Sequence, residues 1–243
     1  MLMISVAMIT LNGELYIKEQ LDSILPQLGP EDELLISDDG SADATLEIIG
    51  EYRQKDERIR LEKGPKEGII ANVEAALGKC RGDVIFLSDQ DDVWLSDKVS
   101  RVMAEFDRGS VLVMHDAKVM NDDLTETIYP SFFSFRGCRS GKWANILKNR
   151  YIGSCMAFRR SLVSHFLPIP RSLPMHDQWI GLAADIRKEK ITLIREPLML
   201  YRRHEGTGSD FSHHSVPEMI RLRMNLLREL KKARPVMLDK GTG

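Results

Sequence analysis

The order of apolar and amphipathic segments in the first half of the chain limits most strongly how it can fold. Short apolar runs typical of β-strands alternate there with stretches whose apolar residues recur at helical spacing. The apolar runs span residues 3–10, 33–37, 59–62, 83–88 and 111–115. Strands that alternate with helices form βαβ units, because two parallel strands need a crossover connection between them. The sequence therefore predicts an α/β fold with a mostly parallel central sheet.

The helices between these strands have recognisable starts. Asn12 follows the first strand and is expected to cap a helix that ends near residue 28. Either Ser41 or Asp43 is expected to cap a second helix over 42–52. Two further helices are expected over 68–77 and 96–106.

The second half of the chain has a less regular pattern. Candidate strands cover 154–158, 191–194 and 198–202. Candidate helices cover 142–148, 176–187 and 216–233. The three tryptophans, Trp94, Trp143 and Trp179, are expected to lie in the core.

Composition narrows the class of protein. The 34 Lys and Arg residues nearly balance the 36 Asp and Glu residues, so the net charge of −2 gives no support for nucleic-acid binding. Cys80, Cys138 and Cys155 are far apart and odd in number, which is typical of reduced, buried thiols in a cytoplasmic protein. The N-terminal apolar run has neither a basic segment nor a cleavage site, so we expect a buried strand rather than a signal peptide.

Two acidic clusters each follow an apolar run. Asp38 and Asp39 end the second run, and the turn Asp89-Gln90-Asp91-Asp92 ends the fourth. In open α/β sheets, ligands bind outside the carboxyl ends of the strands. Crowded carboxylates repel one another unless a cation or a hydrogen-bond donor offsets them, and Mg²⁺ or Mn²⁺ commonly uses one or two carboxylates plus substrate phosphates. Each cluster taken alone also fits a solvated turn with a helix cap.

The order and spacing of these motifs resemble the family 2 glycosyltransferases with the GT-A fold, most of all bacterial rhamnosyltransferase-type members. The resemblance rests on residues 10–13, 37–45 and 89–92, and in the second half on 150–158, 175–179 and 201–204. It implies a single GT-A domain over 1–215, followed by a C-terminal amphipathic helix and tail over 216–243. Within the domain, 1–115 would be the nucleotide-sugar-binding half and 116–215 the acceptor and catalytic half.

The resemblance also implies roles for individual residues. The nucleotide sugar would be held by Thr10, Asn12, Asp38, Asp39, Asn72, Asp89 and Gln90. Asp91 would bind a divalent metal, Mn²⁺ or Mg²⁺, with His204 completing its coordination, and Asp177 would be the catalytic base. The stretch 121–141, with three phenylalanines, would be an acceptor-side loop.

The chain departs from the family pattern at two of these places. Many members carry an Arg-Asn pair where this chain has Ala71-Asn72, so an arginine contact is missing there. Many members have Glu before the base, and this chain has His176, which would either modulate Asp177 or face solvent. Without the resemblance, Asp177 is more simply explained as the cap of a buried helix.

The function that the resemblance implies is inverting transfer of a sugar, with rhamnose as one candidate, from a UDP- or dTDP-linked donor. The acceptor would be a hydroxyl of a glycan or lipid-linked molecule in cell-surface polysaccharide synthesis. A nucleotidyltransferase is an alternative, but residues 10–14 lack a glycine-rich, basic phosphate loop. An inactive nucleotide-sugar-binding domain is another, and the presence of both Asp91 and Asp177 argues against it.

The C-terminal segment 216–234 has the pattern of a basic amphipathic helix. Met219, Leu222, Leu226, Leu227 and Leu230 recur there at helical spacing, and the positions between them include Arg221, Arg223, Arg228, Lys231 and Lys232. Such a helix can lie on an anionic membrane, here the inner face of the cell membrane, or pack on the domain or on the second subunit of a homodimer. Packing is the commoner use of an amphipathic helix.

Overall fold

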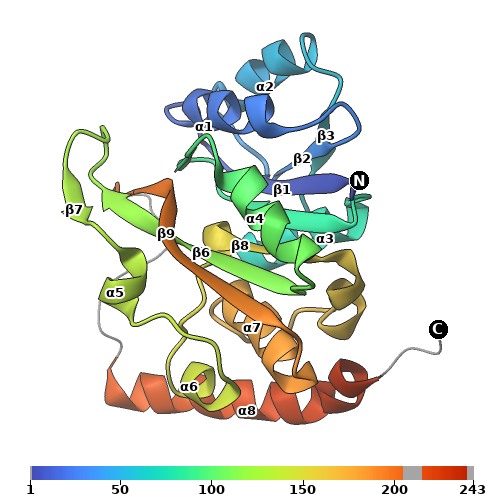
Figure 1. The fold of residues 1–243 in the computed structure, drawn as a ribbon, viewed down its shortest axis with the longest axis vertical. Helices are drawn as coiled ribbons and strands as arrows, with labels where there is room; N and C mark the ends of the chain where they lie inside the picture. The colour runs from blue at the N-terminus through green and yellow to red at the C-terminus, as the bar shows by residue number, and fades with distance from the viewer. Residues whose placement is uncertain (1, 205–214, 240–243) are drawn as a thin grey trace.

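One mixed sheet forms the centre of the molecule (Figure 1). The structure is a computed structural model that describes residues 2–204 and 215–239. The strands are β1 (Ile4–Thr10), β2 (Glu33–Asp38), β3 (Ile59–Lys63), β4 (Val84–Ser88), β5 (Val93–Trp94), β6 (Leu112–Met120), β7 (Thr127–Tyr129), β8 (Met156–Arg159) and β9 (Ile191–Arg202). The helices are α1 (Ile17–Ile24), α2 (Thr45–Arg53), α3 (Ile69–Lys79), α4 (Lys98–Asp107), α5 (Phe132–Arg136), α6 (Lys142–Leu147), α7 (His176–Arg187) and α8 (Val216–Leu238).

The strands run in the order β3-β2-β1-β4-β8-β6-β9-β5, and β7 pairs with β6. The first four in this order are parallel, as the alternating pattern predicts. Thr10 of β1 is in register with Asp38 of β2, and Met8 is in register with Ser88 of β4. The two acidic clusters therefore lie at one edge of the sheet. They are not on neighbouring strands, because β1 lies between β2 and β4.

The second half of the sheet mixes strand directions. β8 is antiparallel to both β4 and β6, whereas β9 is parallel to β6. The predicted strands 191–194 and 198–202 are one continuous strand, so the predicted break is wrong. Pro197 has no N–H to donate, and the register shifts beside it, opposite Asp116, which lets the strand continue past the missing bond. The predicted boundary between the two halves, at 115/116, falls inside β6.

The predicted helix caps Asn12 and Ser41 are wrong, because their side chains bond elsewhere, whereas the alternative Asp43 does bond the first N–H of α2. Asn12 has a positive φ of 49°, and its Oδ1 accepts a hydrogen bond from the Ala42 N–H; α1 begins only at Ile17. The Oγ of Ser41 donates to Asp38, and Oδ1 of Asp43 accepts from the Thr45 N–H. These bonds hold the chain in turns through residue 44, so α2 begins three residues later than predicted.

The remaining predictions about packing have mixed outcomes. All three cysteines are free and buried, as expected. Trp94 and Trp179 lie in the core, but Trp143 is 71% exposed on α6, which corrects the prediction for that residue. The stretch 121–141 is not one loop, because it contains β7 and α5.

The C-terminal helix α8 packs along the end of the molecule opposite α2, with α6 beside it (Figure 1). Leu226, Leu230 and Met237 are buried on one side of α8, which faces α7 and α6. Burial of such a side chain contributes about 2 kcal/mol relative to exposure, so this stripe suffices to fix the helix on the domain. Among the described residues, no helix is both long and apolar enough to cross a bilayer.

Candidate active site

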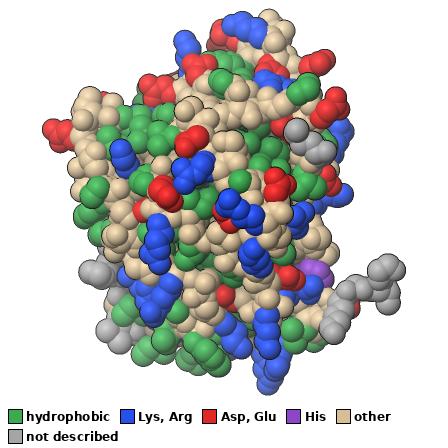
Figure 2. Space-filling view, viewed as in Figure 1, with side chains coloured by type: hydrophobic (Ala, Val, Ile, Leu, Met, Phe, Trp, Pro, Cys, Tyr) green, Lys and Arg blue, Asp and Glu red, His purple; other side chains and the backbone are tan. Residues whose placement is uncertain are grey.

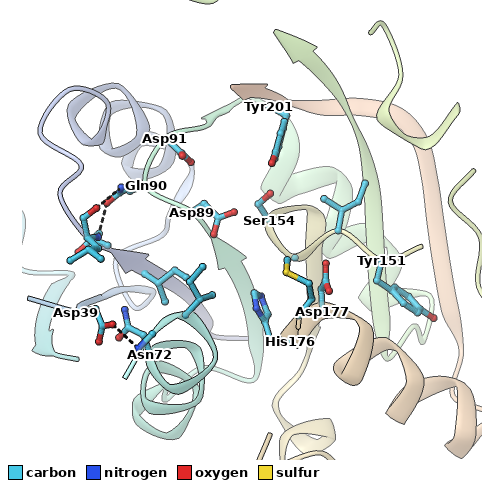
Figure 3. A pocket seen from close by; sticks show the side chains of 18 of the residues that line it. Asp39, Asn72, Asp89, Gln90, Asp91, Tyr151, Ser154, His176, Asp177 and Tyr201 are labelled. Atoms are coloured by element: carbon cyan, nitrogen blue, oxygen red, sulfur yellow. Dashed lines mark hydrogen bonds between the residues drawn. The ribbon is translucent and has the colours of Figure 1, made fainter. Parts of the chain in front are cut away.

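An open pocket lies at the edge of the sheet where β1, β2 and β4 end (Figure 3). One side carries Asp39, Asn72 and Gln90, and the other carries Ser154, Asp177 and Tyr201, with Asp89 between them. The predicted site residues that line the pocket are Thr10, Asp39, Asn72, Asp89, Gln90, Asp91 and Asp177. Asn12 and Asp38 are not among the lining residues, and His204 contacts the site through Asp91.

Asp38 organises the loop that follows β2. Its carboxylate accepts hydrogen bonds from the Thr10 hydroxyl at 2.9 Å, the Gly40 N–H at 3.0 Å, and both the N–H and the hydroxyl of Ser41. Asp38 is buried and makes these contacts within the protein. It therefore holds the pocket wall in place, and its predicted contact with the nucleotide stays a prediction.

Asp39 and Asn72 are fixed by hydrogen bonds to the loop before α3 and to strand β2. The carboxylate of Asp39 accepts from the N–H groups of Lys66 at 2.7 Å and Gly68 at 3.1 Å. The side-chain amide of Asn72 donates to the Ser37 carbonyl, and its oxygen accepts from the Ser37 hydroxyl. Both side chains are pre-organised before any ligand binds, as a specific binding wall requires.

Gln90 ties the acidic turn to the loop after β1. Its Oε1 accepts from the Leu11 N–H at 2.9 Å, and its Nε2 donates to the Leu11 carbonyl at 3.0 Å. A Cβ at Gly13 would lie 2.3 Å from this amide oxygen, so any side chain there would displace the Gln90 amide from Leu11. This pairing fixes the distance between the two segments that meet at the pocket.

The acidic turn accumulates negative charge. Burial, followed by the charges of Asp91 and Asp177, raises the pKa of Asp89 to about 7. Burial, followed by the charges of Asp91 and Asp89, also raises the pKa of Asp92 well above its ordinary value. Oδ2 of Asp92 is buried and has no hydrogen-bond partner within residues 2–204 and 215–239. A cation placed at this turn would favour the ionised carboxylates.

Lys98, which the sequence pattern did not single out, is a buried cation behind the turn. Its Nζ donates to the Ser154 carbonyl at 3.1 Å and lies 3.8 Å from the centre of the Trp94 ring. Burial lowers the pKa of Lys98 to about 7, and the charges of Cys155, Asp92 and Asp89 act in the opposite direction. Lys98 offsets only part of the charge of the three carboxylates.

Asp91 and His204 form the part of the turn that a metal could use. His204 Nε2 lies 2.9 Å from Oδ2 of Asp91, and its ring packs against Tyr16 with centroids 4.6 Å apart and planes tilted by 30°. Arg202 braces the turn from behind, where its Nε donates to the Asp91 carbonyl and its backbone N–H to Asp92. Arg202 lies inside the 201–204 motif, so its position could have been found from the sequence, but its role could not.

These residues fit a divalent cation. No group of three or more His, Cys, Asp or Glu side chains is arranged to hold a metal within residues 2–204 and 215–239. A carboxylate and an imidazole are nevertheless ligands that Mn²⁺ accepts, and such ions often complete their shell with substrate phosphates. Oδ2 of Asp92 has no partner among the described residues, and the raised pKa of Asp89 indicates that its ionised form lacks compensation, which a cation would supply.

Asp177 lies on the opposite wall, in the first turn of α7. It is 3% exposed, and its Oδ1 accepts from the side-chain amide of Asn149 at 2.8 Å and the N–H of Gln178 at 2.6 Å. Burial raises the pKa of Asp177, while His176, Asn149, Gln178 and Arg136 act to lower it. A carboxylate with a raised pKa is a better proton acceptor, as a general base needs. Asn149 was not predicted, because it is far from Asp177 in sequence.

His176 is buried beside the base rather than exposed to solvent, so the solvent-facing alternative is wrong. Burial lowers its pKa, and its Nδ1 has no hydrogen-bond partner among the described residues. Gly153 passes close to it, since a Cβ there would lie 2.8 Å from His176 Nε2. A neutral imidazole therefore shapes the floor of the pocket next to Asp177.

Comparisons with known proteins agree with this architecture. The family model described as glycosyl transferase family 2 matches residues 5–167. A putative glycosyltransferase, EpsH of Bacillus subtilis, is 26% identical over 83% of this chain and 61% of its own length. The dTDP-rhamnosyl transferase RfbG of Shigella flexneri is 27% identical over 82% of this chain and 72% of its own.

Solved structures show the same fold. The S. aureus TarS structure with UDP-GlcNAc superposes with a TM-score of 0.71 and 19% identity, over 96% of this chain and 70% of that one. A mannosyltransferase from Pyrobaculum calidifontis, in complex with GDP-Man and Mn²⁺, gives 0.60 and 16%, over 96% and 64%.

The chain therefore belongs to glycosyl transferase family 2. The α/β fold of the GT-A type, predicted from the sequence, is confirmed by the likeness to TarS. The chain spans about three fifths of the length of the first curated relatives it matches.

Proposed function

We propose that the chain is a metal-dependent, inverting glycosyltransferase that moves a sugar from a nucleoside-diphosphate donor to an acceptor hydroxyl. The observation that carries this proposal is the pocket itself. It brings the acidic turn at Asp91 and the buried carboxylate of Asp177 to opposite walls of one cavity. Family membership and the pre-organised wall formed by Asp39 and Asn72 support the same reading.

The donor and the acceptor would bind to different walls of the pocket. Residues 1–115 would hold the donor, with Thr10 and Asp39 near the nucleobase and Asp89 near the ribose. Residues 116–215 would place the acceptor and the base. Asp91 and His204 would hold Mn²⁺ or Mg²⁺, which when bound stabilises the charge that develops on the diphosphate leaving group. The mannosyltransferase structure that contains Mn²⁺ supports this cofactor.

Asp177 would take the proton of the attacking hydroxyl. A hydroxyl is a weak nucleophile, and loss of its proton during attack makes it competent. The leaving group needs no proton when its charge is stabilised, so one base suffices. The oxygen attacks the anomeric carbon on the face opposite the departing diphosphate, which inverts that centre, as in inverting hydrolysis.

The finer assignment is a dTDP- or UDP-linked donor, with rhamnose as the first candidate sugar. The similarity to the dTDP-rhamnosyl transferase RfbG supports rhamnose, and the TarS complex with UDP-GlcNAc supports a pyrimidine nucleotide. The acceptor would be a glycan or a lipid-linked molecule of cell-surface polysaccharide synthesis, as the family resemblance implies.

Donor turnover tests the proposal without knowledge of the acceptor, because water can take the acceptor's place. Release of nucleoside diphosphate from UDP- and dTDP-sugars should require Mn²⁺ or Mg²⁺. Asp177→Asn should lower this rate by roughly 10²–10⁴-fold and leave the affinity for UDP or dTDP unchanged. The matched control is Asp97→Asn, which replaces an exposed carboxylate at the start of α4 and should leave the rate of nucleoside diphosphate release unchanged. Full turnover by Asp177→Asn would refute the assignment of Asp177 as the catalytic base. No turnover by the wild type would favour an inactive binding domain.

A further inference from the structure

Two helices present exposed apolar side chains at the end of the molecule away from α2. Trp143 and Leu147 are 71% and 65% exposed and lie on one face of α6, because they are four residues apart. Ile220, Met224 and Leu227 are also exposed and follow helical spacing along α8. We call these five side chains the apolar face.

The apolar face is continuous across the two helices. Arg223, which lies between Ile220 and Leu227 on the surface of α8, donates from its Nε to the carbonyl of Leu147 at 2.8 Å. The exposed stripe of α8 therefore runs beside the end of α6. A second stripe of α8, at Leu226 and Leu230, is already buried on the domain.

Basic residues surround the apolar face. The helix α8 carries Arg221, Arg223, Arg228, Lys231, Lys232 and Arg234 against Glu218 and Glu229, a net charge of +4 in a chain whose net charge is −2. Lys142 and Lys148 flank α6. Figure 2 shows hydrophobic and basic side chains together along the lower edge of the molecule, where Figure 1 places α6 and α8.

We propose that the apolar face docks on an anionic lipid bilayer. Apolar side chains, one of them a tryptophan, would enter the headgroup boundary, while the surrounding Arg and Lys side chains meet anionic headgroups. A second copy of this chain fits less well. A two-fold contact through the face would bring two helices of charge +4 together.

Docking in this way would place the acceptor wall of the pocket near the membrane. The helix α6 lies in sequence between two pocket-lining segments, which contain Arg136 and Tyr151, and its Asn145 carbonyl accepts from the side chain of Gln178, next to Asp177. If the proposed function holds, a lipid-linked acceptor would reach Asp177 from that side. The docking itself does not depend on the identity of the donor.

Tryptophan fluorescence provides a direct test. Of the three tryptophans, Trp94 and Trp179 are buried, so a blue shift on binding would come from Trp143. The full chain should shift and float with vesicles that contain phosphatidylglycerol, but not with pure phosphatidylcholine vesicles, and high salt should weaken binding. Trp143→Phe should abolish the shift while flotation persists.

Substitutions in the apolar face test whether this face makes the contact with the vesicles. The double variant L147S/M224S should lower vesicle partitioning roughly tenfold or more, because two apolar side chains are lost. Leu46→Ser, an exposed leucine on α2 at the opposite end, should partition like the wild type.

Three results would overturn the inference. They are no partitioning by the wild type, equal partitioning by L147S/M224S, or a wild-type dimer that this variant converts to monomer without any vesicle binding. The last result would assign the face to a second copy of the chain. Donor turnover without vesicles is measured in parallel, so failure of docking and failure of the proposed function are separable.

Discussion

The acidic cluster that follows β2 and the one that follows β4 are alike in sequence but differ in how their carboxylates are satisfied. Asp38 accepts four hydrogen bonds from neighbouring groups, and Asp39 accepts two from the loop that precedes α3. In the second cluster, Oδ2 of Asp92 is buried without a partner in the part of the chain that the structure describes. The pKa of Asp89 is raised to about 7 by burial and by its acidic neighbours.

This difference indicates that the first cluster mainly stabilises the fold around the pocket, whereas the second is suited to bind a cation. A buried carboxylate with all its acceptors used contributes to the fold and gains little from a ligand. A group of carboxylates that repel one another costs stability until a cation arrives. The first cluster therefore shapes the pocket wall, and under the proposed function the second would hold the metal that binds the donor's diphosphate.

The largest expected effect is that of Asp91→Asn on turnover. Loss of this carboxylate should lower metal-dependent donor turnover on the order of 100-fold or more, because charge on the leaving group is no longer stabilised. The free energy of unfolding should not fall, since repulsion with Asp89 and Asp92 is relieved. Steady-state kinetics and urea unfolding of the same preparation measure both. Full turnover by Asp91→Asn, or a large loss of its stability, would contradict the proposed difference between the two clusters.

The second effect is on stability, at the first cluster. Asp38→Ala should lower the free energy of unfolding by about 2–3 kcal/mol, because buried donors lose their acceptor. Asp123→Ala is the matched control. It removes an exposed turn carboxylate that accepts from Thr125, and should lower the free energy of unfolding clearly less than Asp38→Ala does. Equal losses for the two variants in urea unfolding would mean that Asp38 is no more structural than a surface turn residue.

The third effect is a pH dependence that belongs to the second cluster alone. The pKa of Asp89 is about 7 in the folded chain and near 3.8 when unperturbed, so proton binding favours the folded state. The free energy of unfolding without metal should therefore fall as pH rises from about 4 to about 7. Asp89→Asn should lose less stability over this interval. Buried His115, His176 and Asp177 titrate in both proteins, so the difference reports Asp89 together with its effect on the pKa of Asp92. Parallel curves would contradict the charge accumulation.

The smallest effect is expected at Gln90, which joins the second cluster to the loop after β1. Gln90→Ala removes two hydrogen bonds to the backbone of Leu11, at an exposed position. Each such bond is worth about 1 kcal/mol or less, so KM for the donor should rise several-fold with kcat nearly unchanged. A change in kcat of the size expected for Asp91→Asn would mean that Gln90 contacts the reacting groups.

Much of the first half of the fold follows from its sequence. The apolar runs that become β1, β2 and β4 are buried on both faces, and strong patterns of this kind leave few alternatives. The site residues that end these strands were found for the same reason. Asn12 and Ser41 were misassigned as caps, because a capping side chain and a loop-bridging side chain have the same composition.

The second half was less predictable, because its contacts are distant in sequence. Nothing local indicates that Asn149 would bond to Asp177, or that Lys98 of an amphipathic helix would point inward to the Ser154 carbonyl. Trp143 was placed in the core because large aromatic side chains usually are, yet α6 is short and exposes it. Such features depend on how elements meet in space.

Calorimetric titration of Mn²⁺ into the wild type and Asp91→Asn, with saturating UDP or dTDP, tests the central claim most directly. The account predicts one Mn²⁺ site in the wild type that depends on the nucleotide, and loss of that site in Asp91→Asn, with Asp38→Asn retaining it. Equal Mn²⁺ affinity in the wild type and Asp91→Asn would contradict the assignment of the second cluster as the metal and diphosphate end of the donor site.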